Sequence, residues 1–414
     1  MSDPTAPAEN TAAPRLAIDG GTPVRTAPLP AWPHFAEDEI SAVSAVLRSG
    51  HVNYWTGTQG RDFEAAFAAF TGRKHAIALG NGTAALELAL WVAGIGPGDE
   101  VVVPARTFIA TASSVVMRGA RPVCADIDRD SGNVTADTIR AALSPKTKAV
   151  IVVHLGGWPC DMGPIMDLAT THGLTIIENC AQALGASYRG RPVGSFGHLA
   201  AFSFCQDKIM TTGGEGGMLV TDHEAMFELA WSLKDHGKSF AEAYAGTRTP
   251  GAGFRWQVER FGTNLRMTEM QAAVGLVALG KVPGWVARRR EFAGRLNEAF
   301  SELPALRLTL PAEEFGHAYY KYYAFVRPEA LASGWTRDRV VDSIAAEGIP
   351  CFVGSCPEIY LERAFEGLRP TERLPVAKEL GETSVMLQVH PTLSDEDVGD
   401  MIAAVGKVMR VAGR

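Results

Sequence analysis

The chain has 414 residues, of which 46% are hydrophobic and 21% are charged. These proportions are ordinary for a globular protein with a substantial core, and the length allows two or three domains. The net charge is −7, without a block of like charges. We therefore expect neither nucleic acid nor an anionic membrane surface as a partner.

Residues 1–14 are rich in Ala, Pro and Thr and lack an apolar run, so we expect a mobile tail and not a signal peptide. We expect no stretch of the chain to be long and apolar enough to span a bilayer. The six cysteines are scattered and include no CxxC pair or metal-ligand spacing. Buried, reduced thiols in a cytoplasmic protein are the resulting expectation.

Short β-branched runs alternate with helix-period segments in the first half of the chain. The predicted strands are Ala76–Leu79, Glu100–Val103, Arg121–Ala125, Ala149–Val153, Thr175–Glu178, Ala200–Phe204 and Gly217–Val220. The helices predicted between them are Ala84–Ala93, Ala110–Arg118, Thr135–Ala142 and Met162–His172. This alternation predicts a mostly parallel sheet with helices on both faces.

After about Asn264 the pattern changes to longer helices. The segments predicted here are the helices Met267–Ala278 and Val282–Leu303, a strand region Tyr319–Val326 and a helix Arg337–Glu347. We therefore divide the chain into the tail (residues 1–14), a large domain (residues 15–260) and a smaller C-terminal α/β domain (residues 261–414).

One lysine stands out because of its flanks. Lys208 follows the strand-like run Ala201–Phe204 and precedes the glycine cluster Gly213–Gly217. An amine held in a partly dry site is a nucleophile toward aldehydes, although an isolated lysine beside a glycine turn is more often an exposed loop residue. The order of strand, lysine and Thr-x-Gly-Glu-Gly-Gly turn resembles the lysine segment of the DegT/DnrJ/EryC1/StrS family of sugar aminotransferases. The resemblance extends from about Leu16 to the C-terminus.

The resemblance implies an α/β fold, the pyridoxal-phosphate (PLP)-dependent transferase fold type I. In this fold a large domain contains a mostly parallel seven-stranded sheet, and a smaller α/β domain follows. The family assigns Lys208 two tasks, which are to hold the cofactor covalently and to move a proton between the substrate carbon and the cofactor carbon. Family members that dehydrate their substrate carry histidine instead, so Lys208 disfavours dehydration.

Several residues match the family's cofactor-binding positions. The segment Gly80–Ala84 lies between a strand and a helix, where backbone N–H groups bind anions, although such a sequence alone is more often an ordinary turn and helix cap. The resemblance assigns Gly82, Thr83 and Ser203 to the cofactor phosphate. It also implies that Asn264 reaches the phosphate in a neighbouring subunit, so the active unit would be a homodimer with shared sites.

The cofactor ring has its own candidates. The resemblance places Phe108 against one face of the ring and Gln182 near the 3-hydroxyl group, whereas an ordinary core phenylalanine is the alternative for Phe108. The family usually has aspartate opposite the ring nitrogen, but this chain has Asn179 there. Glu178 is not expected to replace it, because neighbouring strand residues point to opposite faces. The neutral amide predicts a working but weaker electron sink.

Substrate residues are less constrained by the sequence. Of the aromatic and histidine-containing segments that line the family's cleft, we predict only His154 and Tyr320 as substrate-binding residues, and core or ordinary surface positions are the alternative. No metal ligands are predicted. The predicted function is transfer of an amino group from L-glutamate or L-glutamine to a keto-sugar, with a nucleotide-diphospho-keto-hexose as the favoured acceptor.

Three alternatives to this function remain open. A keto-cyclitol of the scyllo-inosose type is a second acceptor, because Ile18–Arg25 resembles the entry segment of family members that act on such compounds. A PLP-dependent lyase or dehydratase would use the same cofactor. A non-catalytic PLP-fold binding protein or regulator is the last alternative, although the sequence has no recognisable DNA-binding module.

Overall fold

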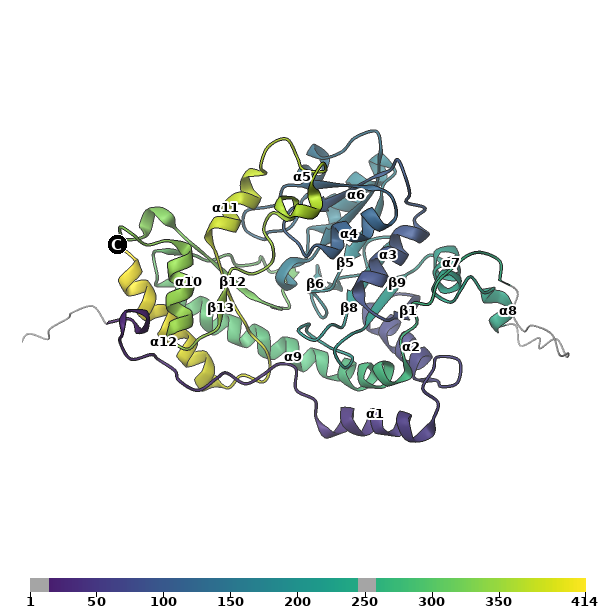
Figure 1. Ribbon diagram of the computed structural model, residues 1–414, viewed down its shortest axis with the longest axis horizontal. Helices are drawn as coiled ribbons and strands as arrows, with labels where there is room; N and C mark the ends of the chain where they lie inside the picture. Colours follow the sequence, from purple (N-terminus) through teal and green to yellow (C-terminus); the bar gives the residue numbers. More distant parts are fainter. Residues whose placement is uncertain (1–14, 245–257) are drawn as a thin grey trace, which may run out of the picture.

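The computed structural model describes residues 15–244 and 258–414, so the predicted tail lies outside the described residues. Figure 1 shows two α/β domains connected by the long helix α9 (Glu269–Ser301). The larger domain contains a seven-stranded sheet and the smaller one a four-stranded sheet. The predicted fold class is thereby confirmed.

The strands of the large sheet are the seven that the sequence predicts, with small shifts at their ends. In spatial order they are β1 (His75–Leu79), β9 (Gly217–Thr221), β8 (Leu199–Ser203), β5 (Thr175–Asn179), β4 (Thr147–Val153), β2 (Glu100–Pro104) and β3 (Arg121–Ala125). All run parallel except β9, which is antiparallel to both β1 and β8. Residues 149–152 are fully buried, as expected for a strand covered on both faces.

Helices cover both faces of this sheet. They are α2 (Gln59–Thr71), α3 (Gly82–Val92), α4 (Ala110–Met117), α5 (Ala136–Ala141), α6 (Met162–His172) and α7 (Glu224–Lys234), with the short α8 (Phe240–Tyr244) at the edge. Helices α3 and α7 pack on the side that carries Ile77 and Leu219. Helix α2 and the first half of α9 pack on the side that carries Phe202 and Met218.

The small domain has an antiparallel sheet. Its strands, in spatial order, are β10 (Leu306–Arg307), β12 (Tyr322–Val326), β14 (Ser384–Leu387) and β13 (Cys351–Phe352), and its helices are α10 (Arg337–Ala346), α11 (Pro375–Thr383) and α12 (Asp395–Ala412). A third sheet has the order β11 (Phe315–Gly316), β6 (Ser187–Tyr188) and β7 (Arg191–Pro192). Short 3-10 helices are η1 (Ala17–Asp19), η2 (Leu155–Gly157), η3 (Pro328–Ala330), η4 (Ile359–Leu361) and η5 (Arg363–Phe365).

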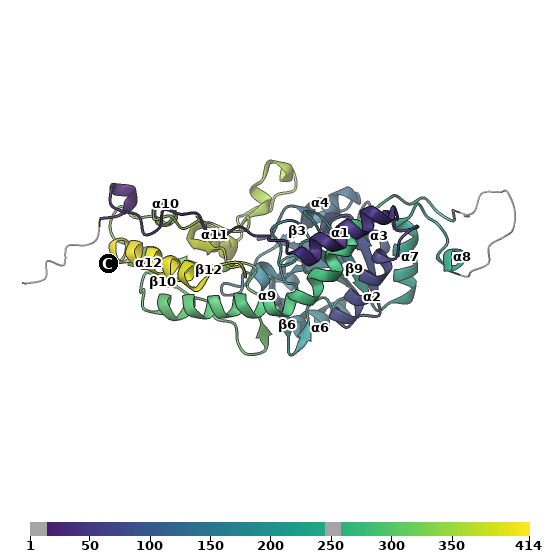
Figure 2. The same cartoon turned by 90° about the horizontal axis from the view of Figure 1, so that it is seen from below.

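The described N-terminal segment packs with the small domain before the chain enters the large one. Leu16 is buried in the small-domain core, and the Glu347 carboxylate accepts hydrogen bonds from the N–H groups of Ala17 and Val24 at 2.9 and 3.0 Å. Figure 2 shows this segment along the small domain and α1 (Glu37–Ser49) on the large one. The boundary at residue 260 stays a prediction, and residues 16–24 belong spatially to the small domain.

The prediction of two helices around residue 280 is wrong, because α9 is continuous through Pro283. A proline inside a helix costs about 3 kcal/mol. Burial of Leu279, Val282 and Val286 beside it offsets that cost. By length and composition α9 is long and apolar enough to span a membrane. Our expectation that no stretch of the chain would be so was wrong. Its packing against α1, α2 and α12 is that of a core helix.

Candidate active site

A cavity of about 1030 Å³ lies where the carboxyl ends of β5 and β8 face the small domain. In open α/β sheets, ligands bind beyond the carboxyl ends of parallel strands. Eight of the predicted site residues line this cavity, namely Gly82, Thr83, Phe108, Asn179, Gln182, Ser203, Lys208 and Tyr320. His154 and Asn264 do not line it.

Lys208 follows β8, and its side chain is 18% exposed, toward the cavity. Its Nζ donates a hydrogen bond to the Tyr320 hydroxyl at 3.2 Å and lies 3.4 Å from Oδ1 of Asp207. The Lys208 carbonyl accepts a hydrogen bond from the Trp32 indole at 2.8 Å. Tyr320 and Asp207 therefore position the amine, and Trp32 fixes the backbone, while the amine remains accessible to a ligand.

Asp207 and Tyr320 form a hydrogen-bonded pair beside this amine. Burial alone would raise the pKa of Asp207, but attraction to Lys208 and the Tyr320 hydrogen bond bring it below its usual value, so the carboxylate stays charged. Burial, together with the Asp207 charge, raises the pKa of Tyr320. Tyr320 thus remains protonated, donates to Asp207 and accepts from Lys208.

The first turn of α3 forms an anion site at one end of the cavity. Asn81 caps the helix, because its Oδ1 accepts a hydrogen bond from the Ala84 N–H at 2.8 Å. The N–H groups at a helix start have no partners within the helix, and Gly82 and Thr83 line the cavity. A Cβ on Gly82 would come within 2.6 Å of the Ser203 Cβ. Glycine therefore lets the turn lie directly against Ser203.

Two residues could contact a planar ring in the middle of the cavity. Phe108 is 66% exposed, so it has an open aromatic face and is not the core phenylalanine of the alternative interpretation. Gln182 is 7% exposed, and its Oε1 accepts a hydrogen bond from the Gly156 N–H at 2.7 Å. That bond fixes the amide and leaves its nitrogen available as a donor.

Asn179 ends β5 and is held by two hydrogen bonds. Its Oδ1 accepts from the Ala181 N–H at 3.1 Å, and its Nδ2 donates to the Thr111 hydroxyl at 3.1 Å. A backbone N–H only donates, so the atom that contacts Ala181 is the amide oxygen of Asn179. Thr111 in turn shares a 2.9 Å hydrogen bond with Thr107. Asn179 therefore contributes a neutral amide, and no negative charge, to the cavity lining.

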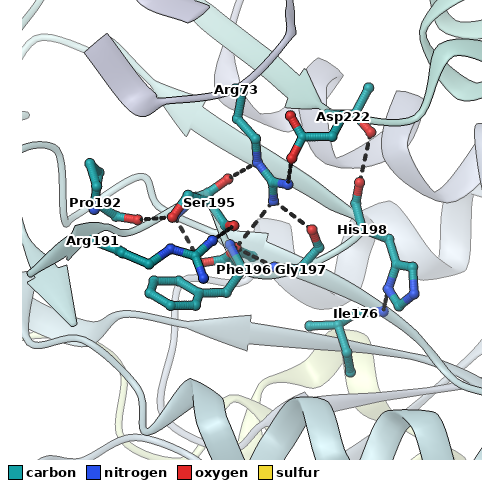
Figure 3. Close-up of polar contacts among 12 residues, drawn as sticks. Arg73, Ile176, Arg191, Pro192, Ser195, Phe196, Gly197, His198 and Asp222 are labelled. Atoms are coloured by element: carbon teal, nitrogen blue, oxygen red, sulfur yellow. Dashed lines mark hydrogen bonds and ion pairs between the residues drawn. The ribbon is translucent and has the colours of Figure 1, made fainter. Parts of the chain in front are cut away.

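Glu178 lies on the opposite side of β5, as strand alternation predicts. Its carboxylate accepts hydrogen bonds from the N–H groups of Phe196 and Gly197 at 2.8 and 2.6 Å and lies 3.7 Å from the Arg73 guanidinium. Arg73 continues this network to the Gly197 carbonyl and to Asp222 (Figure 3). Burial would raise the pKa of Glu178, but a hydrogen bond from His154 and the other contacts lower it.

The structure corrects the expectation for His154. This residue is fully buried, its Nε2 lies 3.0 Å from Oε2 of Glu178, and its Nδ1 accepts from the Cys160 N–H at 2.9 Å. Both ring nitrogens are therefore engaged on the Glu178 side of the sheet, away from the cavity. The predicted substrate contact fails because the chain leaving β4 directs this side chain into the core.

Asn264 is exposed and lies outside the cavity of its own chain. Its Oδ1 accepts a hydrogen bond from the Arg266 N–H at 3.3 Å, and its backbone forms an antiparallel bridge with Asp235. Its proposed contact with a neighbouring subunit stays a prediction.

The predicted site residues did not include Thr111, Asp207 or Lys321, which line the cavity, although Lys321 belongs to a segment expected at the cleft. Asp207 is adjacent to Lys208, and that adjacency was a usable signal. Lys321 is outside β12, because the predicted strand 319–326 begins only at Tyr322. Tyr319 has a φ of 46°, which is incompatible with a strand. Only the tertiary fold brings Thr111 to the cavity.

Comparisons with known proteins agree with this geometry. Residues 33–406 match the profile of the DegT/DnrJ/EryC1/StrS aminotransferase family. The chain is 37% identical over 384 residues to the spore coat polysaccharide biosynthesis protein SpsC of Bacillus subtilis (strain 168), with 92% of this chain and 96% of SpsC covered. It is 50% identical to an aminotransferase from Psychrobacter cryohalolentis of known structure, with a TM-score of 0.91 and coverage of 92% and 99%.

A third comparison concerns the cofactor. A sugar aminotransferase described as putative, from Streptococcus pneumoniae and solved in its PLP form, is 27% identical, with a TM-score of 0.81 and coverage of 93% and 99%. In the present chain, the lysine amine, the helix start and the open aromatic face fit the aldehyde, phosphate and ring of that cofactor. The chain belongs to the DegT/DnrJ/EryC1/StrS family of PLP-dependent aminotransferases.

Proposed function

We propose that the protein transfers an amino group from L-glutamate or L-glutamine to the keto group of a nucleotide-diphospho-keto-hexose. The observation that carries this proposal is the placement of Lys208, which faces the same cavity as the Gly82–Thr83 helix start and the Asn179 amide. The name of the Bacillus subtilis relative, a spore coat polysaccharide biosynthesis protein, supports an amino sugar for a surface polysaccharide as the product. A glycosylated natural product is a second destination for such a sugar.

When bound, PLP supplies an electron sink that stabilises negative charge at the substrate carbon. Lys208 would hold the cofactor covalently and then, as a free amine, move a proton between the two reacting carbons. Tyr320, which is fixed by Asp207, orients the Lys208 amine. Gly82, Thr83 and Ser203 would bind the phosphate, and Phe108 and Gln182 would contact the ring and its 3-hydroxyl group.

The proposal is tested by adding L-glutamate and a panel of keto-sugars to the PLP-loaded protein. We expect L-glutamate alone to remove the visible absorption band of the bound cofactor and to release 2-oxoglutarate. An accepted keto-sugar should then restore the band as the amino sugar is formed. Release of ammonia or water without 2-oxoglutarate would instead identify a lyase or dehydratase. If neither L-glutamate nor L-glutamine changed the spectrum, a binding protein would be favoured.

The sequence similarity of the entry segment Ile18–Arg25 keeps a keto-cyclitol as a second candidate acceptor. In the structure this segment binds to the small domain through Arg25, which pairs with Asp397 at 2.9 Å and with Asp400 at 2.8 Å. A free keto-inositol in the same panel distinguishes the two acceptors.

We also propose a cytoplasmic homodimer in which Asn264 completes the partner's site. Light scattering of the PLP-loaded protein gives the oligomeric state. We expect Asn264→Ala to weaken PLP retention without loss of the dimer. A monomeric protein that retains full activity would contradict shared sites.

A further inference from the structure

A second lysine shares the cavity with Lys208. Lys321 precedes β12, and its side chain is 15% exposed, toward the same cavity. Its Nζ lies 4.6 Å from the centre of the Tyr320 ring, and the Nζ of Lys208 lies 4.9 Å from the same centre. Two ammonium groups therefore flank one aromatic ring, and only one of them is needed to hold the cofactor.

The charges around the cavity make Lys321 distinctive. Among the described residues that line it, the charged ones are Glu87, Asp207, Lys208, Glu215 and Lys321. Covalent attachment of the cofactor would use the Lys208 amine. Lys321 is then the remaining lining cation in this part of the chain, so it is the residue to which an anionic part of a substrate would bind.

A small side pocket of about 50 Å³ continues behind Lys321. Its lining residues are Trp32, Asp207, Arg289, Tyr320, Lys321, Gln388, Val389 and His390. Arg289 is 1% exposed, and its Nη1 donates to the Val389 carbonyl. Its Nε and Nη2 have no hydrogen-bond partner among the described residues. Buried donors of a charged group are normally paired, so the pocket offers donors that lack an acceptor.

The groups around this side pocket favour an anion over a neutral group. Arg289 and Lys321 contribute two positive charges, whereas Asp207 contributes one negative charge and is already bonded to Tyr320. The Asp207 Oδ2 is 3.9 Å from the Lys321 Nζ, which leaves room on the ammonium for another acceptor. The pocket holds a water molecule or a single carboxylate head, but it is too small for a sugar ring or a diphosphate.

The shared contact with Tyr320 favours one source of the anion. Because both amines contact this ring, an anion bound to Lys321 lies in the same part of the cavity as the Lys208 amine. The diphosphate of a sugar nucleotide is separated from its keto carbon by the sugar ring, whereas an amino acid carries a carboxylate on the reacting carbon itself. We propose that Lys321, supported by Arg289, binds a carboxylate of the amino donor. This proposal rests on the proposed function, in which an amino acid is the donor.

Binding without turnover tests the proposal. The probe is glutarate, a dicarboxylate that has no amine to transfer, titrated calorimetrically into the PLP-loaded protein. We expect Lys321→Met to weaken glutarate binding by about tenfold to a hundredfold, the range for one charge-assisted hydrogen bond, and Lys321→Arg to retain most of the affinity. Lys146→Met, at an exposed loop position, is the matched control and should bind glutarate like the parent protein.

Kinetics of the first half-reaction provide a second readout. Lys321→Met should raise the L-glutamate concentration needed for half-maximal loss of the cofactor band, with little change in the rate at saturation. Equal glutarate affinity in the parent protein and Lys321→Met would overturn the proposal. Glucuronate could instead bind more tightly than glutarate and lose that affinity in Lys321→Met. This result would show that Lys321 binds an acidic acceptor sugar and not the amino donor.

The two proposals fail in distinguishable ways. Failure of every keto-sugar to restore the cofactor band, while glutarate still binds through Lys321, would reject the proposed function alone. Normal 2-oxoglutarate release with glutarate binding that does not depend on Lys321 would reject only the carboxylate site.

Discussion

The two walls of the cavity are built differently. On the large-domain wall, the first turn of α3 presents N–H groups beside the ends of β5 and β8. On the small-domain wall, the contacts come from side chains, including those of Tyr320, Lys321 and Gln388. Backbone donors fixed by a sheet suit a group that is the same in every reaction, whereas side chains can change without disturbing the sheet. We therefore expect the large-domain wall to bind the cofactor and the small-domain wall to select the substrate.

The largest effect is expected from substitution of Lys208, whose amine lies between the two walls. Lys208→Ala should abolish both covalent cofactor attachment and amino transfer, because within residues 15–244 and 258–414 Lys208 is the lysine that follows β8 into the cavity. Absorption spectra and 2-oxoglutarate release measure the two losses separately. If the variant still turned over repeatedly, Lys321 would become the candidate for the attaching amine, and the roles of the two walls would be reversed.

The phosphate end of the large-domain wall should be sensitive to a single methyl group. Gly82→Ala places a Cβ within 2.6 Å of the Ser203 Cβ, so the helix start must move away. We expect PLP affinity to fall by one to two orders of magnitude, as 1–3 kcal/mol of overpacking implies. Gly96→Ala is the control, because its Cβ would meet nothing within 4 Å. Unchanged PLP retention on dialysis would show that the phosphate binds elsewhere.

The rate of amino transfer should depend on the charge of residue 179, which we expect to contact the ring nitrogen of the cofactor. Asn179→Asp keeps an acceptor for the Ala181 N–H, and the Thr111 hydroxyl can rotate to donate. An aspartate compensates a protonated ring nitrogen, so we expect faster turnover, by about five- to thirtyfold for 1–2 kcal/mol. If turnover and the pH dependence of the cofactor spectrum both stayed the same, Asn179 would not contact the ring nitrogen.

The smallest expected effect is a pH dependence of glutarate binding to Lys321 on the small-domain wall. Burial, together with the charges of Arg289 and Lys208 and partly opposed by Asp207, lowers the pKa of Lys321 to about 8. Burial, with the charges of Arg289 and Lys321, also lowers the pKa of His390 to about 4, so His390 stays neutral near pH 8. Because glutarate binds the protonated lysine, its affinity should fall by up to about tenfold per pH unit above 8. Lys321→Arg should remove this dependence.

The difference between the two walls also explains which site residues could be predicted from the sequence. Local patterns predict the strands and the helix that carry Gly82, Ser203 and Lys208, and the family resemblance, not the local pattern, implied that these residues belong to the site. Lys321 lies in a turn whose conformation depends on Tyr319. His154 occupied a similar strand-end position, but its side chain turned into the core. Local pattern predicts where a strand ends and does not predict the path of the chain after it.

Helix α9 has a consequence for how the cavity can change its width. Its first half belongs to the core of the large domain and its second half to that of the small domain. A hinge rotation that separated the two walls would have to bend this helix or pull it out of one core. The continuous helix α9 therefore largely fixes the distance between the two walls. Ligands enter a cleft whose width changes little.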